Sequence, residues 1–99
     1  MSMARLTAEA VQAALRKLPG WSLKGEAICK EYTWPSFPDA ITFVNQVADL
    51  AEKADHHPDI LINYRRVTLT LSTHSEGGIT QKDFDLAARI EETESRQSE

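Results

Sequence analysis

The spacing of apolar residues along the chain switches between two periods, and each period predicts one kind of element. Apolar residues three and four apart predict a first helix over residues 7–18, which a Pro-Gly pair ends. A long helix is predicted to open near Ser36 and to end near Asp55, with an apolar stripe formed by Phe37, Ala40, Ile41, Val44, Val47, Ala48 and Ala51. A third helix is predicted after Thr80, a typical N-cap residue, with Asp83 at the capping-box position.

Runs of alternating apolar and polar residues predict four strands between these helices. Residues 21–23 and 27–34 are predicted to form two strands joined by a turn that contains a glycine. The run over residues 60–73 is rich in strand-forming residues but is longer than a typical strand of about 5–6 residues. We therefore expect this run to fold into a hairpin that turns near Arg65 and Arg66.

The resulting order α-β-β-α-β-β-α predicts an α+β fold. Two hairpins joined by a long helix indicate a four-stranded antiparallel sheet with three helices packed on one face. No internal repeat or linker divides the chain, so residues 1–99 are predicted to form one domain. Residues 93–99 are polar and are expected to form a frayed tail after the third helix.

Two features depart from these simple patterns. Lys30 falls on the same predicted strand face as Ile28 and Tyr32, so its stem is expected either to snorkel or to approach a ligand. Phe43 and Leu50 extend the apolar surface of the long helix to a second face. Deep burial and a self-association surface explain this second face equally well.

Composition and charge narrow the classes of function. The 99 residues carry a net charge of −4, whereas nucleic-acid binders usually have a basic footprint. No apolar run approaches the roughly 18 residues of a membrane span, and no signal peptide is expected at the N-terminus. The single cysteine, Cys29, allows no internal disulfide and is expected to be a small buried apolar residue rather than a reactive one. These features predict a cytoplasmic protein that binds neither nucleic acid nor membrane.

All three histidines of the chain, His56, His57 and His74, lie in one short window. Pro58 disfavours the α region for His57, so the histidine pair is expected where the long helix ends. His74 closes the alternating run and is expected at a strand end, before a flexible glycine-containing loop over residues 75–78. Helix end and strand end are expected to converge on one pocket.

Three kinds of role compete for these histidines. Zinc sites often contain three histidines or two histidines and a carboxylate. The adjacent His56 and His57 point to opposite sides of an extended chain, however, and the spacing lacks an H-x-H or H-x₃-H pair, which disfavours a metal. The second role is structural, with capping and solvated surface histidines.

The third role is acid–base catalysis without a cofactor. An imidazole with a pKa of about 6.5 donates and accepts protons near neutral pH. The chain contains no activated serine or cysteine motif and no phosphate-binding loop. Asp83 either caps the third helix or orients a protonated histidine, and the residues alone favour the cap. Glu52 lies four residues before His56, so the two are expected to share a helix face, although an ordinary solvated carboxylate fits as well.

This segment resembles the signature of the pterin-4a-carbinolamine dehydratases, also called 4a-hydroxytetrahydrobiopterin dehydratases. The matching positions, with their spacings kept, are Glu52, His56-His57-Pro58, Tyr64, His74 and Asp83. The flanking sequences Leu-Ser-Thr-His and Asp-Phe-Asp-Leu-Ala and the early Gly20-Trp21 are also similar. The resemblance extends from about residue 5 to 92.

The resemblance implies the predicted fold, assembled as a homodimer or homotetramer. It also implies that the protein removes water from a 4a-hydroxytetrahydropterin to give the quinonoid dihydropterin, in tetrahydrobiopterin recycling, with no metal and no organic cofactor. His56 and His74 are then the acid/base pair, and His57 mainly binds the pterin.

The same resemblance gives supporting roles to three further residues. Asp83 supports an imidazole, which reverses the preference for a purely capping role. Pro58 fixes the histidine loop, and Glu52 supports the histidines without contacting the substrate itself.

A competing class of function is that of a protein-interaction module rather than an enzyme. Animal members of this family also act as dimerisation partners of a homeodomain transcription factor. Such a role would depend on an exposed apolar helix face, here Phe43 and Leu50. The sequence itself gives no support for such a partner.

Overall fold

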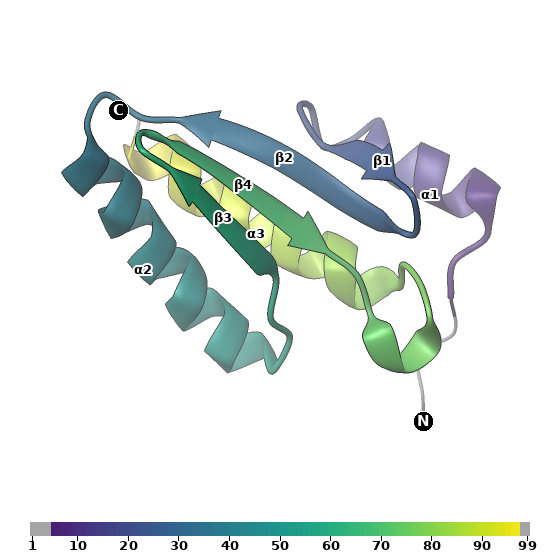
Figure 1. Cartoon of the computed structure of the whole chain (residues 1–99). Coiled ribbons are helices and arrows are strands. Elements are labelled where there is room, and N and C mark those ends of the chain that lie inside the picture. The colour runs from purple at the N-terminus through teal and green to yellow at the C-terminus, as the bar shows by residue number, and fades with distance from the viewer. Residues whose placement is uncertain (1–4, 98–99) are drawn as a thin grey trace.

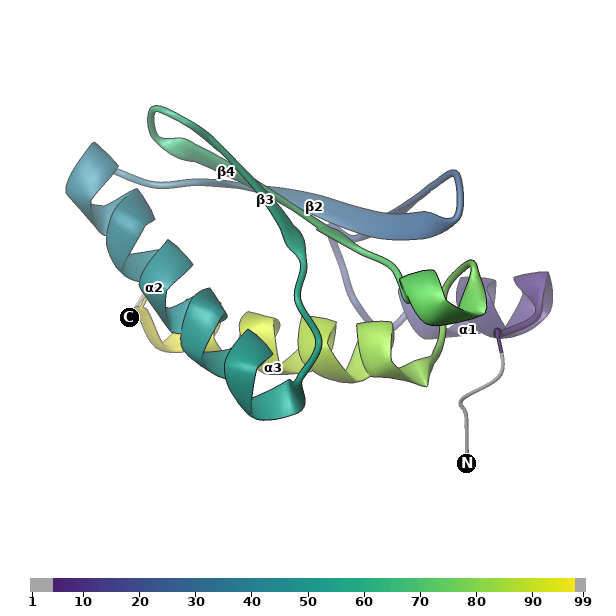
Figure 2. The ribbon, with the colours of Figure 1, turned by 60° about the horizontal axis from the view of Figure 1, so that its bottom comes forward.

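Four antiparallel strands form one sheet in the order β1-β2-β4-β3, and three helices cover one of its faces (Figures 1 and 2). This computed structural model describes residues 5–97. The elements are α1 (Ala8–Leu15), β1 (Ser22–Lys24), β2 (Ala27–Thr33), α2 (Phe37–Ala54), β3 (Asp59–Asn63), β4 (Arg66–Leu71), the short 3₁₀ helix η1 (His74–Glu76) and α3 (Gln81–Gln97). The predicted α+β fold and its element order are confirmed.

Side-chain caps explain where the first two helices begin. The Thr7 hydroxyl accepts a hydrogen bond from the backbone N–H of Ala10 at 3.1 Å. The Ser36 hydroxyl likewise accepts the N–H of Asp39 at 3.2 Å. Each cap satisfies a backbone donor that the first turn of a helix leaves without a partner.

The strand register places alternate residues of the sheet against the helices. Residues that face the helices lie opposite one another across β2 and β4, in the pairs Ile28–Leu71, Lys30–Leu69 and Tyr32–Val67. The core between sheet and helices contains the buried residues Ile28, Tyr32, Trp34, Phe43, Val47, Val67, Leu69, Leu71, Phe84, Leu86 and Ile90. No helix within residues 5–97 covers the opposite face of the sheet (Figure 2).

Lys30 faces the helices because it has a partner there. Its Nζ lies 2.5 Å from Glu91 Oε1 on α3 and also donates to the carbonyl of Pro19 at 3.2 Å. The indole N–H of Trp21 donates to the same Glu91 oxygen at 3.1 Å. The charge on the apolar face is therefore paired with Glu91 on α3.

The second apolar face of α2 is explained mainly by burial. Phe43 is fully buried and packs against the rings of Tyr32 and Trp34, whereas Leu50 is half-buried at the edge of the core. Cys29 is half-buried. None of the helices within residues 5–97 is long and apolar enough to cross a membrane.

Several features of the elements differ from the predictions. Helix α1 ends at Leu15, because tighter i→i+3 hydrogen bonds take over before Leu18. The second hairpin turns at residues 64–65, one residue earlier than expected. The loop expected over residues 75–78 includes part of η1, and the backbone bridge between Thr73 and Gly78 closes it. Helix α3 runs to Gln97, so residues 93–97 are helical rather than frayed, and residues 98–99 lie outside the described part.

Candidate active site

The end of α2 sends its two histidines in different directions. Asp55 follows the helix in the left-handed conformation, with φ 50°, and the N–H of His56 donates to the carbonyl of Ala51 at 3.0 Å. Pro58 prevents the chain from resuming a helix. The side chain of His56 is only 10% exposed, while that of His57 is 57% exposed.

His56 is held by a buried carboxylate. Its Nε2 lies 2.5 Å from Oδ1 of Asp83, whose side chain is fully buried in the first turn of α3. The pair joins two segments that are 27 residues apart in the sequence. Such a short charge-assisted contact fixes both the position and the orientation of the imidazole.

Asp83 also caps its own helix, so it combines the two predicted roles. Its Oδ2 accepts the backbone N–H of Thr80 at 2.9 Å and the hydroxyl of Thr73 at 2.9 Å. Because the Thr73 hydroxyl donates its one proton to Asp83, Thr73 Oγ1 acts as the acceptor toward Thr80, whose hydroxyl donates to it at 2.8 Å. The N–H of Lys82 in turn donates to Thr80 Oγ1 at 3.2 Å. This directed chain of donors ends on the carboxylate.

The network assigns the proton between His56 and Asp83. A carboxylate oxygen accepts hydrogen bonds, so the shared proton belongs to Nε2 of His56. Nδ1 is then the nitrogen that carries a lone pair in the neutral ring and a proton in the imidazolium. His56 therefore has one nitrogen committed to structure and one that can exchange protons.

His57 has a different kind of partner. Its Nε2 makes a short contact with Oε2 of Glu52, one turn back on α2, and both side chains are exposed. Glu52 thus contacts His57 and not His56, with which it was expected to share a helix face. The exposed position gives this pair little electrostatic strength, but it restrains the His57 ring.

His74 lies beyond the end of its strand. Strand β4 ends at Leu71, and His74 begins η1, so the expectation that it closes the strand is wrong by three residues. The hydrogen bonds between Thr73 and Gly78 bend the chain here, and the His74 side chain is exposed.

The three histidines line one cavity of about 270 Å³. The other lining residues are Asp55, Ser72, Thr73, Ser75 and Lys82. A second hollow of about 220 Å³ shares His57, Ser72 and His74 with the first and is also lined by Glu26, Ala27, Asp59 and Thr70. The end of α2 and the segment that follows β4 thus meet at one cavity, although His74 lies beyond the strand end at which it was expected.

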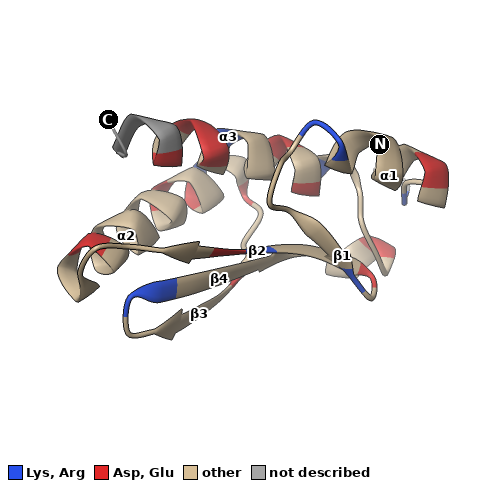
Figure 3. Cartoon of the chain, turned by 90° about the horizontal axis from the view of Figure 1, so that it is seen from above, with Lys and Arg blue, Asp and Glu red and all other residues tan. Residues whose placement is uncertain are grey.

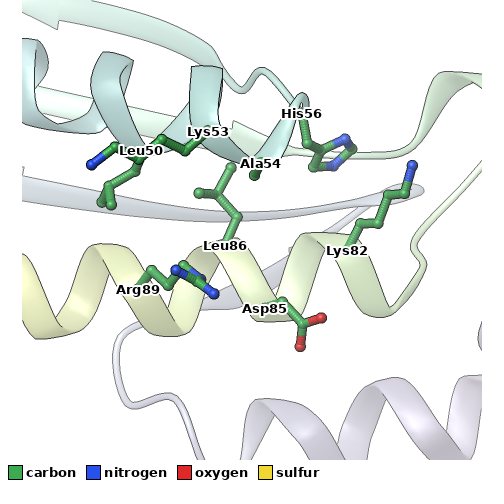
Figure 4. Close-up of a pocket in the computed structure, with 8 residues that line it drawn as sticks. All are labelled: Leu50, Lys53, Ala54, His56, Lys82, Asp85, Leu86 and Arg89. Atoms are coloured by element: carbon green, nitrogen blue, oxygen red, sulfur yellow. The ribbon is translucent and has the colours of Figure 1, made fainter.

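A third hollow adjoins His56 on the helical side. It lies between α2 and α3, where His56 and Lys82 stand at one end and Lys53 and Arg89 farther along (Figure 4). Leu50, Ala54 and Leu86 supply apolar walls, and Asp85 adds an acidic side chain to the lining. His56 is thus approached from two sides.

The remaining predicted residues are placed differently. Pro58, directly after the histidine pair in the sequence, is half-buried. Tyr64 lies at the hairpin turn, at the far end of β3 from the histidines, where its ring stacks on Phe37 at 6.5 Å. Within residues 5–97, no group of three or more His, Cys, Asp or Glu side chains has the geometry to hold a metal ion.

Sequence reasoning missed the polar residues that connect the site. Thr73 and Lys82 carry no distinctive spacing, and the alternating pattern gave Thr73 no special role. The adjacency of Lys82 to Asp83 was the one available signal for a nearby cation.

Known proteins resemble this chain along most of its length. The family model described as pterin 4 alpha carbinolamine dehydratase matches residues 4–93. A protein of Roseiflexus sp. strain RS-1, provisionally named as a pterin-4-alpha-carbinolamine dehydratase, is 54% identical over 88 residues, covering 89% of this chain and 95% of the relative.

Two solved structures resemble this chain to different degrees. A crystal structure of a transcriptional coactivator/pterin dehydratase from Brucella melitensis matches with a TM-score of 0.84 and 43% identity, over 88% of this chain and 95% of that one. A pterin dehydratase-like protein described as a RuBisCO assembly factor of the alpha-carboxysome shares the fold, with a TM-score of 0.58, 24% identity, and coverage of 71% of this chain and 81% of that one. On the sequence match and the first of these structures, this chain belongs to the pterin 4 alpha carbinolamine dehydratase family.

Proposed function

We propose that this protein removes water from a 4a-hydroxytetrahydropterin and releases the quinonoid dihydropterin. The observation that carries the proposal is the convergence of His56, His57 and His74 on one cavity, with the innermost imidazole held by the buried Asp83. Family membership supports the substrate class.

The reaction needs one acid and one base. The lone pair of N5 expels the hydroxyl at C4a, a general acid protonates the leaving oxygen, and a general base takes the proton from N5. Water leaves, a C=N bond forms, and the acid and base together neither gain nor lose a proton. Two imidazoles supply both groups near neutral pH, and such proton transfers typically contribute about 10²–10⁴-fold each.

His56 and His74 are the proposed acid/base pair. Asp83 fixes the His56 ring and stabilises its imidazolium, while Nδ1 exchanges the proton. His57, exposed and restrained by Glu52, is proposed to bind the pterin. Pro58 holds the pair of histidines at the helix end.

The wider setting is also a proposal. The activity belongs to tetrahydrobiopterin recycling in the cytoplasm, with no metal or organic cofactor. The protein is proposed to act as a homodimer or homotetramer, and the exposed apolar residues of the edge strand β3 support self-association.

The test is the rate at which a freshly generated 4a-hydroxytetrahydropterin loses water, with and without the protein. The wild-type protein and a Lys17→Ala control, altered at an exposed position that lines none of the hollows around the histidines, should accelerate dehydration equally. His74→Ala should lower the rate by about 10²–10⁴-fold while leaving assembly intact. A wild-type protein that assembles but gives no acceleration would favour the competing class of interaction module.

A further inference from the structure

Strand β3 is an apolar sheet edge without the usual protection. All five of its residues are exposed, and the three in its centre are Ile60, Leu61 and Ile62, exposed by 36, 61 and 40%. Natural edge strands are normally blunted by lysine, proline or a bulge, and residues 59–63 contain none of these. Such an edge is a template for pairing with a further strand.

The hairpin fixes which backbone groups point outward. Asn63 and Arg66 close a two-residue turn, so they exchange both of their hydrogen bonds. Bonded and non-bonded pairs alternate along an antiparallel ladder. Ile60 and Ile62 therefore direct their N–H and C=O groups away from β4, and a partner strand must bond to them.

Charge identifies the partner strand as a second copy of β3. Asp55 lies shortly before β3 and Asp59 is its first residue, so this end of the strand is acidic. The hairpin turn after β3 is basic at Arg65 and Arg66 (Figure 3). Antiparallel pairing of two copies sets the basic turn of each beside the acidic start of the other, twice by symmetry.

This pairing brings the turn of one copy to the histidines of the other. When Leu61 lies opposite Leu61 of the partner subunit, all five residues of β3 are paired and Pro58 lies opposite the partner's Tyr64. The outward groups allow shifts of two residues, which place the partner's Tyr64 opposite His56 or Ile60. Every such register sets the partner's aromatic turn next to the end of β3 that carries the histidines.

We propose that the active site is shared, with the partner subunit's Tyr64 covering the cavity beside His57 and its ring packing on the flat pterin. Tyr64 is suited to this role because it is 67% exposed in the single chain and keeps a bulky ring at φ 55°, a conformation that favours glycine. The identity of the ligand rests on the proposed dehydratase function, whereas the sharing of the site does not.

A complementation experiment tests the sharing. Tyr64→Gly removes the ring and relieves the backbone strain, so the variant should fold and assemble but lose at least about tenfold in kcat/KM, chiefly through KM. His74→Ala keeps Tyr64 and the hairpin turn but lacks one member of the proposed acid/base pair. The two variants are co-expressed with different affinity tags and purified through both tags, so that only mixed oligomers are assayed.

In a mixed dimer one site has the histidine of one chain and the tyrosine of the other, so activity should return to roughly half the wild-type value. Activity no higher than in the separate variants would show that Tyr64 acts within its own chain and would overturn the proposal. A wild-type protein that is monomeric at assay concentration, or a Tyr64→Gly variant with normal kcat/KM, would also overturn it. Full activity of His74→Ala alone would instead contradict the proposed function.

A charge swap tests the pairing independently of any substrate. Arg65→Glu should weaken self-association at low ionic strength, because it sets like charges together near Asp59. The double variant Asp59→Arg with Arg65→Glu should restore it, as measured by sedimentation. Unchanged association of Arg65→Glu would contradict the proposed pairing.

Discussion

Nε2 of His56 lies 2.5 Å from Oδ1 of Asp83, and the same aspartate caps the helix on which it lies. One fully buried carboxylate thus links the end of α2, the start of α3 and the segment after β4. The geometry of the proposed acid or base is therefore coupled to the packing of three elements.

Replacing this carboxylate by an amide should damage activity far more than assembly. In Asp83→Asn the side-chain oxygen can still accept from Thr80, but the amide N–H₂ then faces His56 and favours the opposite tautomer. We expect kcat to fall by at least about 100-fold, with a changed pH profile. Glu92→Gln, at an exposed position on the same helix that lines none of the three hollows, is the matched control for kcat and should stay within about twofold. Equal losses in the two variants would contradict the assigned role.

The hydroxyl of Thr73 should contribute measurably to stability. Thr73→Val removes the donor to Asp83 and the acceptor for Thr80, both buried, so unfolding free energy should fall by about 1–3 kcal/mol. Thr68→Val, on the helix-free face of β4, should change it by less than about 0.5 kcal/mol. Urea unfolding followed by tryptophan fluorescence measures both unfolding free energies. Similar values for the two variants would contradict a stabilising role of the Thr73 hydroxyl.

The pairing of Lys30 with Glu91 should support the fold but not the chemistry. Both side chains are about four-fifths buried, with exposures of 19 and 20%, so Lys30→Met leaves a carboxylate without its cation. We expect a loss of about 1–3 kcal/mol in unfolding free energy. The dehydration rate of the folded variant should match the wild type, since neither residue lines a histidine cavity. A specific loss of kcat would assign Lys30 to ligand binding instead.

Tyr32 should make the protein sensitive to alkali. Burial of its hydroxyl, with Glu91 nearby, raises the pKa of Tyr32 far above the ordinary value of about 10. At high pH the folded state keeps the Tyr32 proton that the unfolded state loses. The contribution of Tyr32 to the unfolding free energy is therefore full below pH 10 and declines above it. Wild-type unfolding free energy should fall by up to about 1.4 kcal/mol per pH unit more than that of Tyr32→Phe above this pH. Parallel curves in urea titrations between pH 9 and 11 would contradict this assignment.

The sequence was informative where local rules operate. Periodicity located all three helices and four strands, and Pro58 correctly placed the histidine pair at a helix end. The position of Asp83 predicted its cap, and the family resemblance added its contact with an imidazole. Both proved to be properties of one side chain, because its two oxygens face different partners.

Long-range packing decided what local rules could not. The charge of Lys30 was unexplained until α3 brought Glu91 to it from 61 residues away. The apolar run of β3 also gave no sign of being an edge, because strand order depends on how the hairpins meet in the sheet. The second apolar face of α2 was ambiguous for the same reason.

The central claim is that His56 and His74 carry out acid–base dehydration of a 4a-hydroxytetrahydropterin. The most direct test is stopped-flow measurement of pterin dehydration with wild-type protein, His56→Ala, His74→Ala and the double variant, each checked for assembly. Each single variant should lose about 10²–10⁴-fold in rate, and the double variant should approach the spontaneous rate. A double variant that folds and still dehydrates the pterin at the wild-type rate would contradict the account.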